Sequence, residues 1–459
     1  MKQKRTSFRL LAAVTALSAV FGTSSVAALE RLESDVVVVG GGAAGSAAAI
    51  AAQEQGAKTV LLEKTAFPAG AGTFAGGLFA ADSSQQKEQG KVVDKAWLYK
   101  QYMDISGGYV NSRLVRRIID ESGFTVDWLN KHGADVKLVS AGTGHAFDHV
   151  GMPATLHAYQ KGGAKAIRAL HDSFRKLGGT IRYTTPAQEL LFDEEGRICG
   201  VKAKDKKGET VEIRAKAVVL ATGGFGGNAE MMTKFIGKPH TLGEVTQNTG
   251  DGLRMTQTMG ARLWHMTAYS CPVGMKVPGL KTAIQLNILA PSHIWVDQDG
   301  KRFVNEKGLD NHTCLYAVNQ MDPIRHRYPR IPCYLIMDEK ARKAGPICGG
   351  ATSGYALNRE NYKWSKDNSA EIKSGILIQA ATIRELAEKI KVPADTLEAT
   401  VNRWNTDIKN GKDTEFGRIL KRDPKGKTAF AGREAPIVSE PLGDGPYYAV
   451  ALYPTMLNT

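Results

Sequence analysis

A glycine-rich loop between a buried strand and a small-residue helix is the feature that most constrains this fold. The segment Asp35–Val39 ends in four consecutive valines, which is typical of a strand buried on both faces. It leads into Gly40–Gly45, which satisfies G-x-G-x-x-G, and then into an alanine-rich segment, 46–55, that we expect to be helical. The pattern alone carries little weight in a chain with 49 glycines. Its position between a strand and a helix predicts a dinucleotide-binding unit.

A second predicted strand, Lys58–Leu62, ends at an acidic residue. This residue, Glu63, lies 18 positions after Gly45. At this place a carboxylate accepts hydrogen bonds from a ribose 2′-hydroxyl and disfavours a 2′-phosphate. The glycines allow the backbone to approach a pyrophosphate, whose charge the N-terminus of the helix stabilises. The alternative is a glycine cluster that only packs the helix against the sheet.

Small residues recur in later segments. Residues 69–77 are all small except for one phenylalanine, and such a segment can pass closely over a flat ring system. The segment 217–224 reads as another buried strand that ends in a Thr-Gly-Gly turn, and Asn248–Gly252 begins another helix.

In this order the motifs resemble those of the flavoprotein subunits of fumarate reductases, succinate dehydrogenases and their soluble exported relatives. The resemblance runs from about Asp35 to Thr459. The motifs that carry it are the glycine loop with its glutamate, ATGGFGGN (221–228), TGDG (249–252), WVDQDGKRFVNE (295–306), NRWN (402–405), DTEFGR (413–418) and GPYYA (445–449).

The resemblance implies an α/β fold, in which a Rossmann-type FAD-binding domain carries an inserted α+β cap, or clamp, domain. It also implies that the dinucleotide is FAD. The FAD contacts carried over by matching motif are Gly40, Gly42, Ala44, Gly45, Glu63, Lys64, Gly72, Thr73, Gly76, Gly77, Ala187 and Asp251. Relatives with covalent flavin have a histidine in the small-residue stretch, and residues 70–77 contain none, so we expect non-covalent FAD.

We expect four parts along the chain: a signal peptide (1–27), the FAD-binding domain (31–261), the cap (263–434) and a segment returning to the FAD-binding domain (436–459). Relatives continue beyond this point with a glycine-rich turn, so we expect a C-terminally truncated chain. The further elements expected are helices at 115–132, 164–177 and 393–409, a hairpin-like excursion at 180–215, a hairpin at 295–303 and a strand at 447–453.

The N-terminal segment has the features of a cleaved export signal. Basic residues at 2–5 precede an apolar stretch at 10–21 and small residues at 25–27, which predicts an exported, periplasmic protein. Lys4 and Arg5 leave both the Sec and the twin-arginine routes open. No later segment is long and apolar enough to span a membrane. Part of the net charge of +14 lies in this signal and the rest is scattered, which favours a solvated basic surface over a nucleic-acid site.

Metal and haem sites are not expected. The five cysteines lie far apart without a CxxC or CxxCH pattern, which excludes c-type haem attachment and argues against a zinc or iron–sulfur site. His145 and His149 are four residues apart, but the glycines around them indicate a loop.

The positions that bind fumarate in the resembled family are replaced. The arginine acid falls on Asp310, the His-Pro pair on Cys271–Pro272 and a histidine pair on 457–458, and the last anchoring arginine would lie beyond Thr459. These replacements favour a larger or less charged substrate than a small dicarboxylate.

Three residues are candidates for the missing catalytic acid: Asp310, His312 and Tyr316. Gln285 and Cys271 are candidates for substrate contact. For each of them an ordinary structural role is the alternative: a polar cap residue, a surface glutamine or a buried thiol.

The predicted function is that of an exported FAD-dependent oxidoreductase acting on a carbon–carbon double bond beside a carboxylate or carbonyl. The substrate would be a small unsaturated acid or ketone, with electrons from a separate cytochrome or flavin-carrying partner. One alternative is a desaturase similar to the 3-ketosteroid dehydrogenases, which use tyrosines where fumarate reductases use arginine and histidine. The other is a flavin-binding fragment without turnover.

Overall fold

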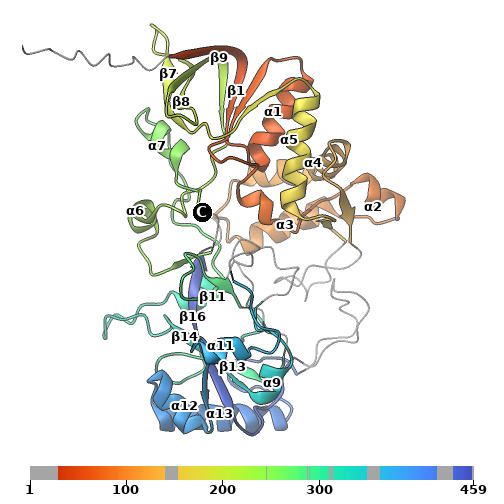
Figure 1. Ribbon diagram of the computed structural model, residues 1–459. Coiled ribbons are helices and arrows are strands. Elements are labelled where there is room, and N and C mark those ends of the chain that lie inside the picture. Colours follow the sequence, from red (N-terminus) through yellow and green to blue (C-terminus); the bar gives the residue numbers. More distant parts are fainter. Residues whose placement is uncertain are drawn as a thin grey trace, which may run out of the picture.

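The computed structural model describes most of the chain, and Figure 1 shows how its elements are arranged. The described residues are 29–139, 154–243, 246–286, 288, 290–309, 314–348, 362–420 and 438–456. The expected signal peptide, Asp310, His312 and the pair His145 and His149 lie outside them.

A six-stranded sheet forms one end of the molecule (Figure 1). Four strands pair in parallel and two add antiparallel at one edge. In spatial order they are β6 (Thr180–Arg182), β2 (Thr59–Leu62), β1 (Glu30–Val39), β9 (Thr210–Leu220), β8 (Ile198–Lys204) and β7 (Ala187–Phe192).

Two helices cover one face of this sheet, because their apolar sides match its valine and leucine side chains. These helices, α1 (Ala43–Glu54) and α5 (Gly163–Lys176), share a core with β1 and β2 that includes Val38, Ile50 and Phe174. Each fully buried aliphatic or aromatic side chain of this kind contributes about 1.5–3 kcal/mol. The neighbouring elements are α2 (Ser84–Glu88), α3 (Lys95–Ile105), α4 (Ser112–Lys131) and a three-stranded sheet of β3 (Gly77–Phe79), β5 (Leu156–Tyr159) and β4 (Val136–Leu138).

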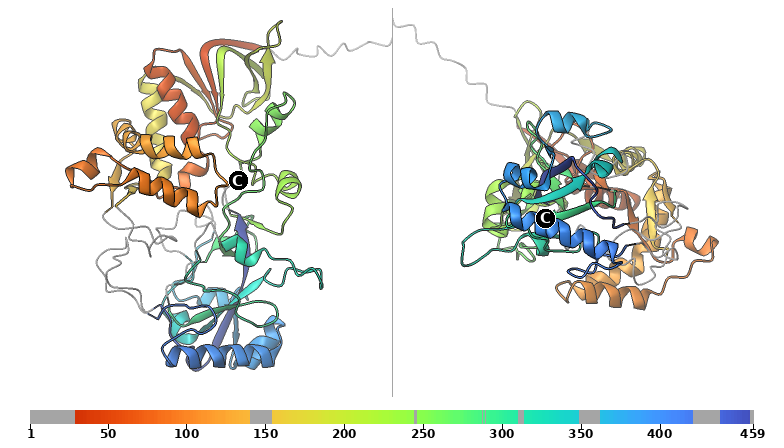
Figure 2. Two further views of the ribbon diagram at one scale, coloured as in Figure 1. Left: turned by 180° about the vertical axis from the view of Figure 1, so that it is seen from behind. Right: turned by 90° about the horizontal axis from the view of Figure 1, so that it is seen from below.

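A second sheet lies at the other end of the molecule, as the left view of Figure 2 shows. Its spatial order is β12 (Ile284–Gln285), β11 (Val273–Met275), β16 (Tyr447–Met456), β14 (Cys333–Asp338) and β13 (His293–Val296), and β10 (Thr241–Leu242) and β15 (Ile378–Ala380) also pair with β16. The helices of this half are α8 (Cys314–Val318), α9 (Glu339–Lys343), α11 (Ser369–Lys373), α12 (Ile383–Ile390) and α13 (Ala394–Lys409).

Alternating side chains give the second sheet a core on each face. Leu335 and Met337 pack on one side with Val450, and Ile336 packs on the other side against α12 and α13. This alternation is the ordinary consequence of the strand period of two residues.

The strand β16 differs from the expectation for residues 436–459. It is present, but it pairs along most of its length with β14, β15 and β11, and only Thr455 and Met456 pair with β10. It does not pair with the six-stranded sheet within the described residues. The reason is its composition: apolar residues fill both faces, which suits the centre of the second sheet.

Two expected hairpins also form differently. β6 is a parallel edge strand beside β2, so the antiparallel excursion comprises β7, β8 and β9 only. The turn at Asp297–Gly300 is present, with Asp297 N–H donating to Lys301 O at 2.9 Å. However, residues 301–303 form no strand, and β13 pairs with β14 instead.

The other expected elements are confirmed within a few residues. They are the strands at 35–39 and 58–62 and the helices at 46–55, 115–132, 164–177 and 393–409. Among the helices of the described residues, not one has the length and apolar character needed to cross a membrane.

Candidate functional site

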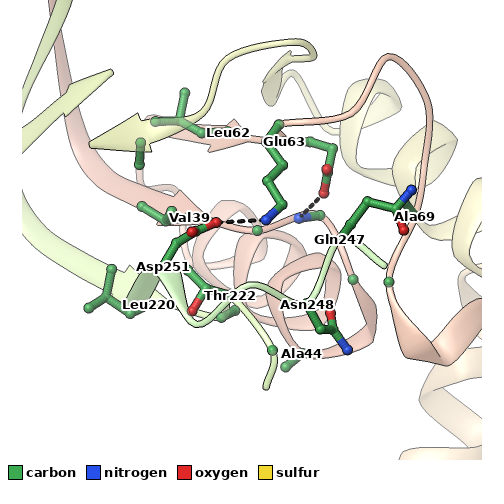
Figure 3. Close-up of a pocket in the computed structure, with 18 of the residues that line it drawn as sticks. Val39, Ala44, Leu62, Glu63, Ala69, Leu220, Thr222, Gln247, Asn248 and Asp251 are labelled. Atoms are coloured by element: carbon green, nitrogen blue, oxygen red, sulfur yellow. Dashed lines mark hydrogen bonds and ion pairs between the residues drawn. The ribbon is translucent and has the colours of Figure 1, made fainter. Parts of the chain in front are cut away.

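A cavity of about 470 Å³ lies where β1, β2 and β9 end (Figure 3). The last residues of these strands, Val39, Leu62 and Leu220, line it. In open α/β sheets ligands bind beyond the carboxyl ends of the strands, so this is the place at which a dinucleotide is expected.

The glycine loop brings the N-terminus of α1 to this cavity. Gly40 has φ +103°, and a Cβ on it would lie 2.3 Å from the Ala221 carbonyl oxygen, so only glycine fits there. A Cβ on Gly45 would lie 1.8 Å from the Gly40 carbonyl oxygen. Gly45 therefore allows the helix to pack closely on the strand, and Ala43 and Ala44 at the start of the helix line the cavity.

Glu63 is a buried carboxylate at the end of β2. Its Oε2 accepts the Gly41 N–H at 2.8 Å, and its Oε1 accepts the N–H and the hydroxyl of Thr65 at 2.8 and 2.9 Å. A carboxylate offers about four acceptor sites. The two backbone N–H groups use two of them, and the single hydrogen of the Thr65 hydroxyl is shared with Phe67 O at 2.6 Å, so Glu63 retains the capacity to accept a hydroxyl from a ligand in the cavity.

Lys64 and Asp251 form an ion pair at the cavity, with Nζ and Oδ2 separated by 2.6 Å (Figure 3). Thr249 Oγ1 accepts a hydrogen bond from Lys64 and donates one to Asp251. Burial raises the pKa of Asp251, but the bonds from Lys64 and Thr249 outweigh it, and the pKa lies below its usual value. The carboxylate is therefore charged at neutral pH.

The structure brings eight of the twelve predicted FAD-contact residues to the cavity wall. They are Gly40, Gly42, Ala44, Glu63, Lys64, Gly72, Ala187 and Asp251.

The other four lie close to the cavity without lining it. Gly45 is the packing glycine of α1, and a Cβ on Gly77 would strike the backbone of β5 at His157. Thr73 donates its hydroxyl to Gly70 O at 2.8 Å, and Gly76 O accepts the Tyr159 N–H.

Several lining residues were not predicted from the sequence to contact FAD. They are contributed by the Thr-Gly-Gly turn after β9, by Gln247 and Asn248, and by Thr185 and Pro186 before β7. The turn belongs to the ATGG motif, so this motif was the available signal. Gln247 and Asn248 immediately precede TGDG but carry no pattern of their own.

Of the predicted catalytic and substrate residues, the three that the structure describes do not line this cavity: Tyr316, Gln285 and Cys271. Tyr316 is on α8 with 71% of its surface exposed. Gln285 is half-buried on β12. Cys271 is fully buried, and burial raises the pKa of its thiol, so it is no nucleophile at neutral pH.

A phenol that the sequence reading missed lies beside Cys271. Tyr269 is buried in the same apolar cluster as Cys271 and Phe225, and Phe225 follows the Thr-Gly-Gly turn of the cavity. The side chains of Tyr269 and Asn319 are hydrogen-bonded at 2.5 Å. Burial raises the pKa of Tyr269, so its hydroxyl stays protonated at neutral pH.

The part of the chain that the structure describes contains no group of three histidine, cysteine, aspartate or glutamate side chains able to hold a metal ion. None of its five cysteines is in a disulfide bond.

The model of the FAD binding domain family matches residues 35–459. The chain belongs to this family. It is 32% identical over 387 residues to the vinyl phenol reductase of Lactiplantibacillus plantarum, which covers 80% of this chain and 74% of that protein.

Other relatives agree with this assignment. Fumarate reductase (cytochrome) of Shewanella frigidimarina is 29% identical over 88% of this chain, and the match spans 63% of that protein. The fold is that of 3-ketosteroid delta1-dehydrogenase from Sterolibacterium denitrificans, with a TM-score of 0.73 at 20% identity over 92% of this chain and 88% of that one. The family is one of FAD-dependent oxidoreductases, and the cofactor is FAD.

The residues of the cavity fit FAD. The glycine loop leaves room for a backbone approach, since the nearest described atom to a Cβ on Gly42 would be Ala69 O at 3.9 Å. The N-terminus of α1 suits a pyrophosphate, and Glu63 has an acceptor site for a ribose hydroxyl.

Proposed function

We propose that this chain is an exported FAD-dependent oxidoreductase that reduces a carbon–carbon double bond. When bound, FAD supplies the hydride from its N5 atom to an alkene carbon, and the proposed alkene lies next to a carbonyl, a carboxylate or another electron-withdrawing group. The observation that carries the proposal is the cavity at the ends of β1, β2 and β9, with Glu63 and the pair Lys64–Asp251 at its wall.

The chain's own residues bind and orient the cofactor in this proposal. Glu63 accepts a ribose hydroxyl, and the first N–H groups of α1 hold the pyrophosphate. Lys64 contributes a positive charge beside these phosphates while it stays paired with Asp251. The absence of histidine from residues 70–77 supports non-covalent binding.

The composition around Cys271 supports a substrate with little charge. Cys271 stands where the resembled family has a histidine, and it packs among Phe225, Leu315 and Met456. An apolar cluster of this kind gives no binding energy to a second carboxylate, whose burial without a partner is costly. The name of the vinyl phenol reductase, an enzyme for a substrate without a carboxylate, agrees with this inference.

The electron donor in this proposal is a separate cytochrome or flavin-carrying protein, because the sequence contains no CxxCH motif for its own haem. Export follows from the basic and apolar segments at 2–5 and 10–21.

A viologen-linked assay tests the reaction. The purified chain, loaded with FAD, is supplied with reduced viologen and with a panel of unsaturated acids, enones and vinyl phenols. Oxidation of viologen that depends on one of these alkenes supports the proposal. Absence of turnover with the whole panel, in a protein that retains FAD, contradicts it and leaves the desaturase and the flavin-binding fragment as the alternatives.

A desaturase is the second candidate, and Tyr269 favours it. A buried, protonated phenol can polarise a ketone oxygen, and the resembled 3-ketosteroid dehydrogenases have tyrosines where fumarate reductases have arginine and histidine. This candidate predicts transfer of electrons from a 3-ketosteroid to an artificial dye, with no alkene-dependent oxidation of viologen.

A further inference from the structure

Helix α5 contacts two separate segments of the FAD cavity. At its start, a Cβ on Gly163 would lie 2.2 Å from the Gly72 carbonyl oxygen, so the helix packs directly against η1 (Ala71–Phe74). Two turns later, His171 reaches the glycine loop at Gly41. The helix therefore contacts both the glycine loop (Gly40–Gly45) and the small-residue segment (69–77).

His171 is completely buried and has a partner on each ring nitrogen. Nε2 lies 2.8 Å from the Gly41 carbonyl oxygen, and Nδ1 lies 2.6 Å from the Tyr183 hydroxyl. A carbonyl oxygen only accepts, so Nε2 carries the hydrogen, and the neutral ring then accepts the Tyr183 O–H at Nδ1. Burial lowers the pKa of His171 and Arg175 acts in the same direction, which outweighs the opposing effect of Glu63.

Both backbone polar groups of Gly41 are thereby occupied. Its carbonyl accepts from His171 at 2.8 Å and, more weakly, from the Ser46 hydroxyl at 3.3 Å, and its N–H donates to Glu63 Oε2 at 2.8 Å. The space behind Gly41 is equally restricted, because a Cβ there would lie 3.0 Å from both Glu63 Oε2 and His171 Cε1. Tyr183, His171, Gly41 and Glu63 form one continuous chain of hydrogen bonds.

We propose that His171, held by Tyr183, is a positioning residue for FAD binding: through the Gly41 peptide it fixes the carboxylate of Glu63 in the orientation that accepts the ribose hydroxyl. His171 itself does not line the cavity. Its effect is transmitted through Gly41: His171 holds the carbonyl of the Gly41–Gly42 peptide, and Glu63 holds the N–H of the Gly40–Gly41 peptide. The two peptide groups meet at the α-carbon of a glycine, where the dihedral angles are otherwise unusually free.

The inference rests on FAD binding and is independent of which substrate is reduced. It predicts that affinity for FAD depends on the Nε2–H donor rather than on the imidazole ring. Glutamine places an N–H donor at the position of Nε2 and leucine places none. His171→Gln should therefore retain FAD affinity, and His171→Leu should lose it.

The experiment measures the dissociation constant for FAD with the full chain, by titration of the FAD-depleted protein and by the flavin fluorescence released on dilution. Removing the shorter of the two hydrogen bonds to the Gly41 carbonyl, and leaving only the 3.3 Å bond from Ser46, should weaken FAD binding by about tenfold in His171→Leu. Tyr183→Phe removes the hydroxyl that sets the tautomer and should weaken binding by a smaller factor. Both losses concern FAD binding alone, so they should be measurable in the absence of any substrate.

His132→Leu is the matched control. His132 is also buried and also hydrogen-bonded to α5, with Nδ1 2.7 Å from Ser173 Oγ, but its polar partners are Ser173 and Glu54 rather than the glycine loop. Its replacement should leave FAD affinity unchanged. Equal losses of FAD affinity in His132→Leu and His171→Leu would show that His171 only packs in the core and would overturn the proposal. A His171→Gln variant that binds FAD as weakly as His171→Leu would also overturn it. If His171→Leu fails to fold, Tyr183→Phe and His171→Gln still decide the question, because Tyr183→Phe with unaltered affinity contradicts the proposal.

Discussion

Lys64 and Asp251 are 187 residues apart in the sequence, yet their side chains form a 2.6 Å ion pair at the wall of the FAD cavity. The pair joins the end of β2 to the start of α7 (Asp251–Gln257). Each partner is about one quarter exposed, so the pair is partly screened by solvent and contributes little to folding stability. Its significance lies in the charge that it presents to the cofactor.

Lys64→Met should therefore weaken FAD binding with little effect on the stability of the FAD-free protein. The change leaves the charged Asp251 carboxylate beside the two phosphates of FAD, and we expect a loss of about tenfold or more in affinity. Asp251→Asn in the same protein should recover part of the loss. Titration of the wild type, the two single variants and the double variant with FAD gives the coupling free energy between Lys64 and Asp251. Strictly additive effects would show that the pair does not act as a unit at the cofactor.

Two glycines close to the cavity, Gly45 and Gly76, test folding stability and FAD binding separately. Gly45→Ala places a methyl group 1.8 Å from Gly40 O and should destabilise the protein by about 3 kcal/mol or more. Gly76→Ala meets no described atom within 4 Å, so the fold should tolerate it. If Gly76 contacts FAD as the family motif implies, the alanine should lower the affinity for FAD without changing the free energy of unfolding. Chemical denaturation and FAD titration measure the two effects, and normal FAD affinity in Gly76→Ala removes this residue from the site.

A buried ion network stabilises the second half of the chain. Arg302 donates to both carboxylate oxygens of Glu306 and of Asp413 at 2.9–3.0 Å, and its guanidinium lies 4.5 Å from the ring centroid of Trp404. Arg302→Met leaves the buried Asp413 carboxylate without its cation and leaves Glu306 with Arg418 alone, at 3.3 Å, and should cost about 3–5 kcal/mol in the free energy of unfolding.

The control for this variant is Arg384→Met. Arg384 also contacts two carboxylates, at 2.6 Å from Asp395 and from Glu398, but its side chain is half exposed. Its loss should cost about 1 kcal/mol or less. Urea denaturation of the two variants beside the wild type gives the comparison, and similar costs for both would contradict the role assigned to burial.

The same network predicts a loss of stability in acid. Burial raises the pKa of Asp413, but the hydrogen bonds from Arg302 and from the Arg418 N–H outweigh it and lower the pKa from 3.8 to about 2. A carboxyl group with a lowered folded pKa stabilises the protein fully above pH 3.8, and this contribution disappears as the pH falls towards 2. Denaturation midpoints measured across this range should fall for the wild type and fall less steeply for Asp413→Asn. Parallel curves would contradict the assignment.

The part of the site closest in sequence to the glycine loop was predictable. A run of valines, a glycine pattern and a following glutamate predict local structure, because each residue type meets a conformational or burial requirement within a single βαβ unit. Glu63 therefore appears at the cavity as expected. By contrast, the bond between His171 and Gly41 joins residues 130 positions apart, and a single histidine on an amphipathic helix has no distinguishing pattern.

The position of β16 in the second sheet also could not be predicted from local sequence. Its length and its apolar residues predict a buried strand, but not which sheet takes it. The pairing of Cys333–Asp338 with 447–452 is decided by packing on both faces of the second sheet, between the core of Leu335 and that of Ile336. Such partners are set by tertiary contacts rather than by local propensity.

The most direct test of the central claim is reoxidation of the protein's own reduced flavin by an alkene. The FAD-loaded chain is reduced without oxygen, and unsaturated acids, enones and vinyl phenols are added one at a time while the visible flavin absorption is followed. We predict that at least one alkene restores the absorption of oxidised flavin and yields the saturated product. Flavin that stays reduced with every alkene, but is reoxidised by an artificial dye, would contradict the assignment as an alkene reductase.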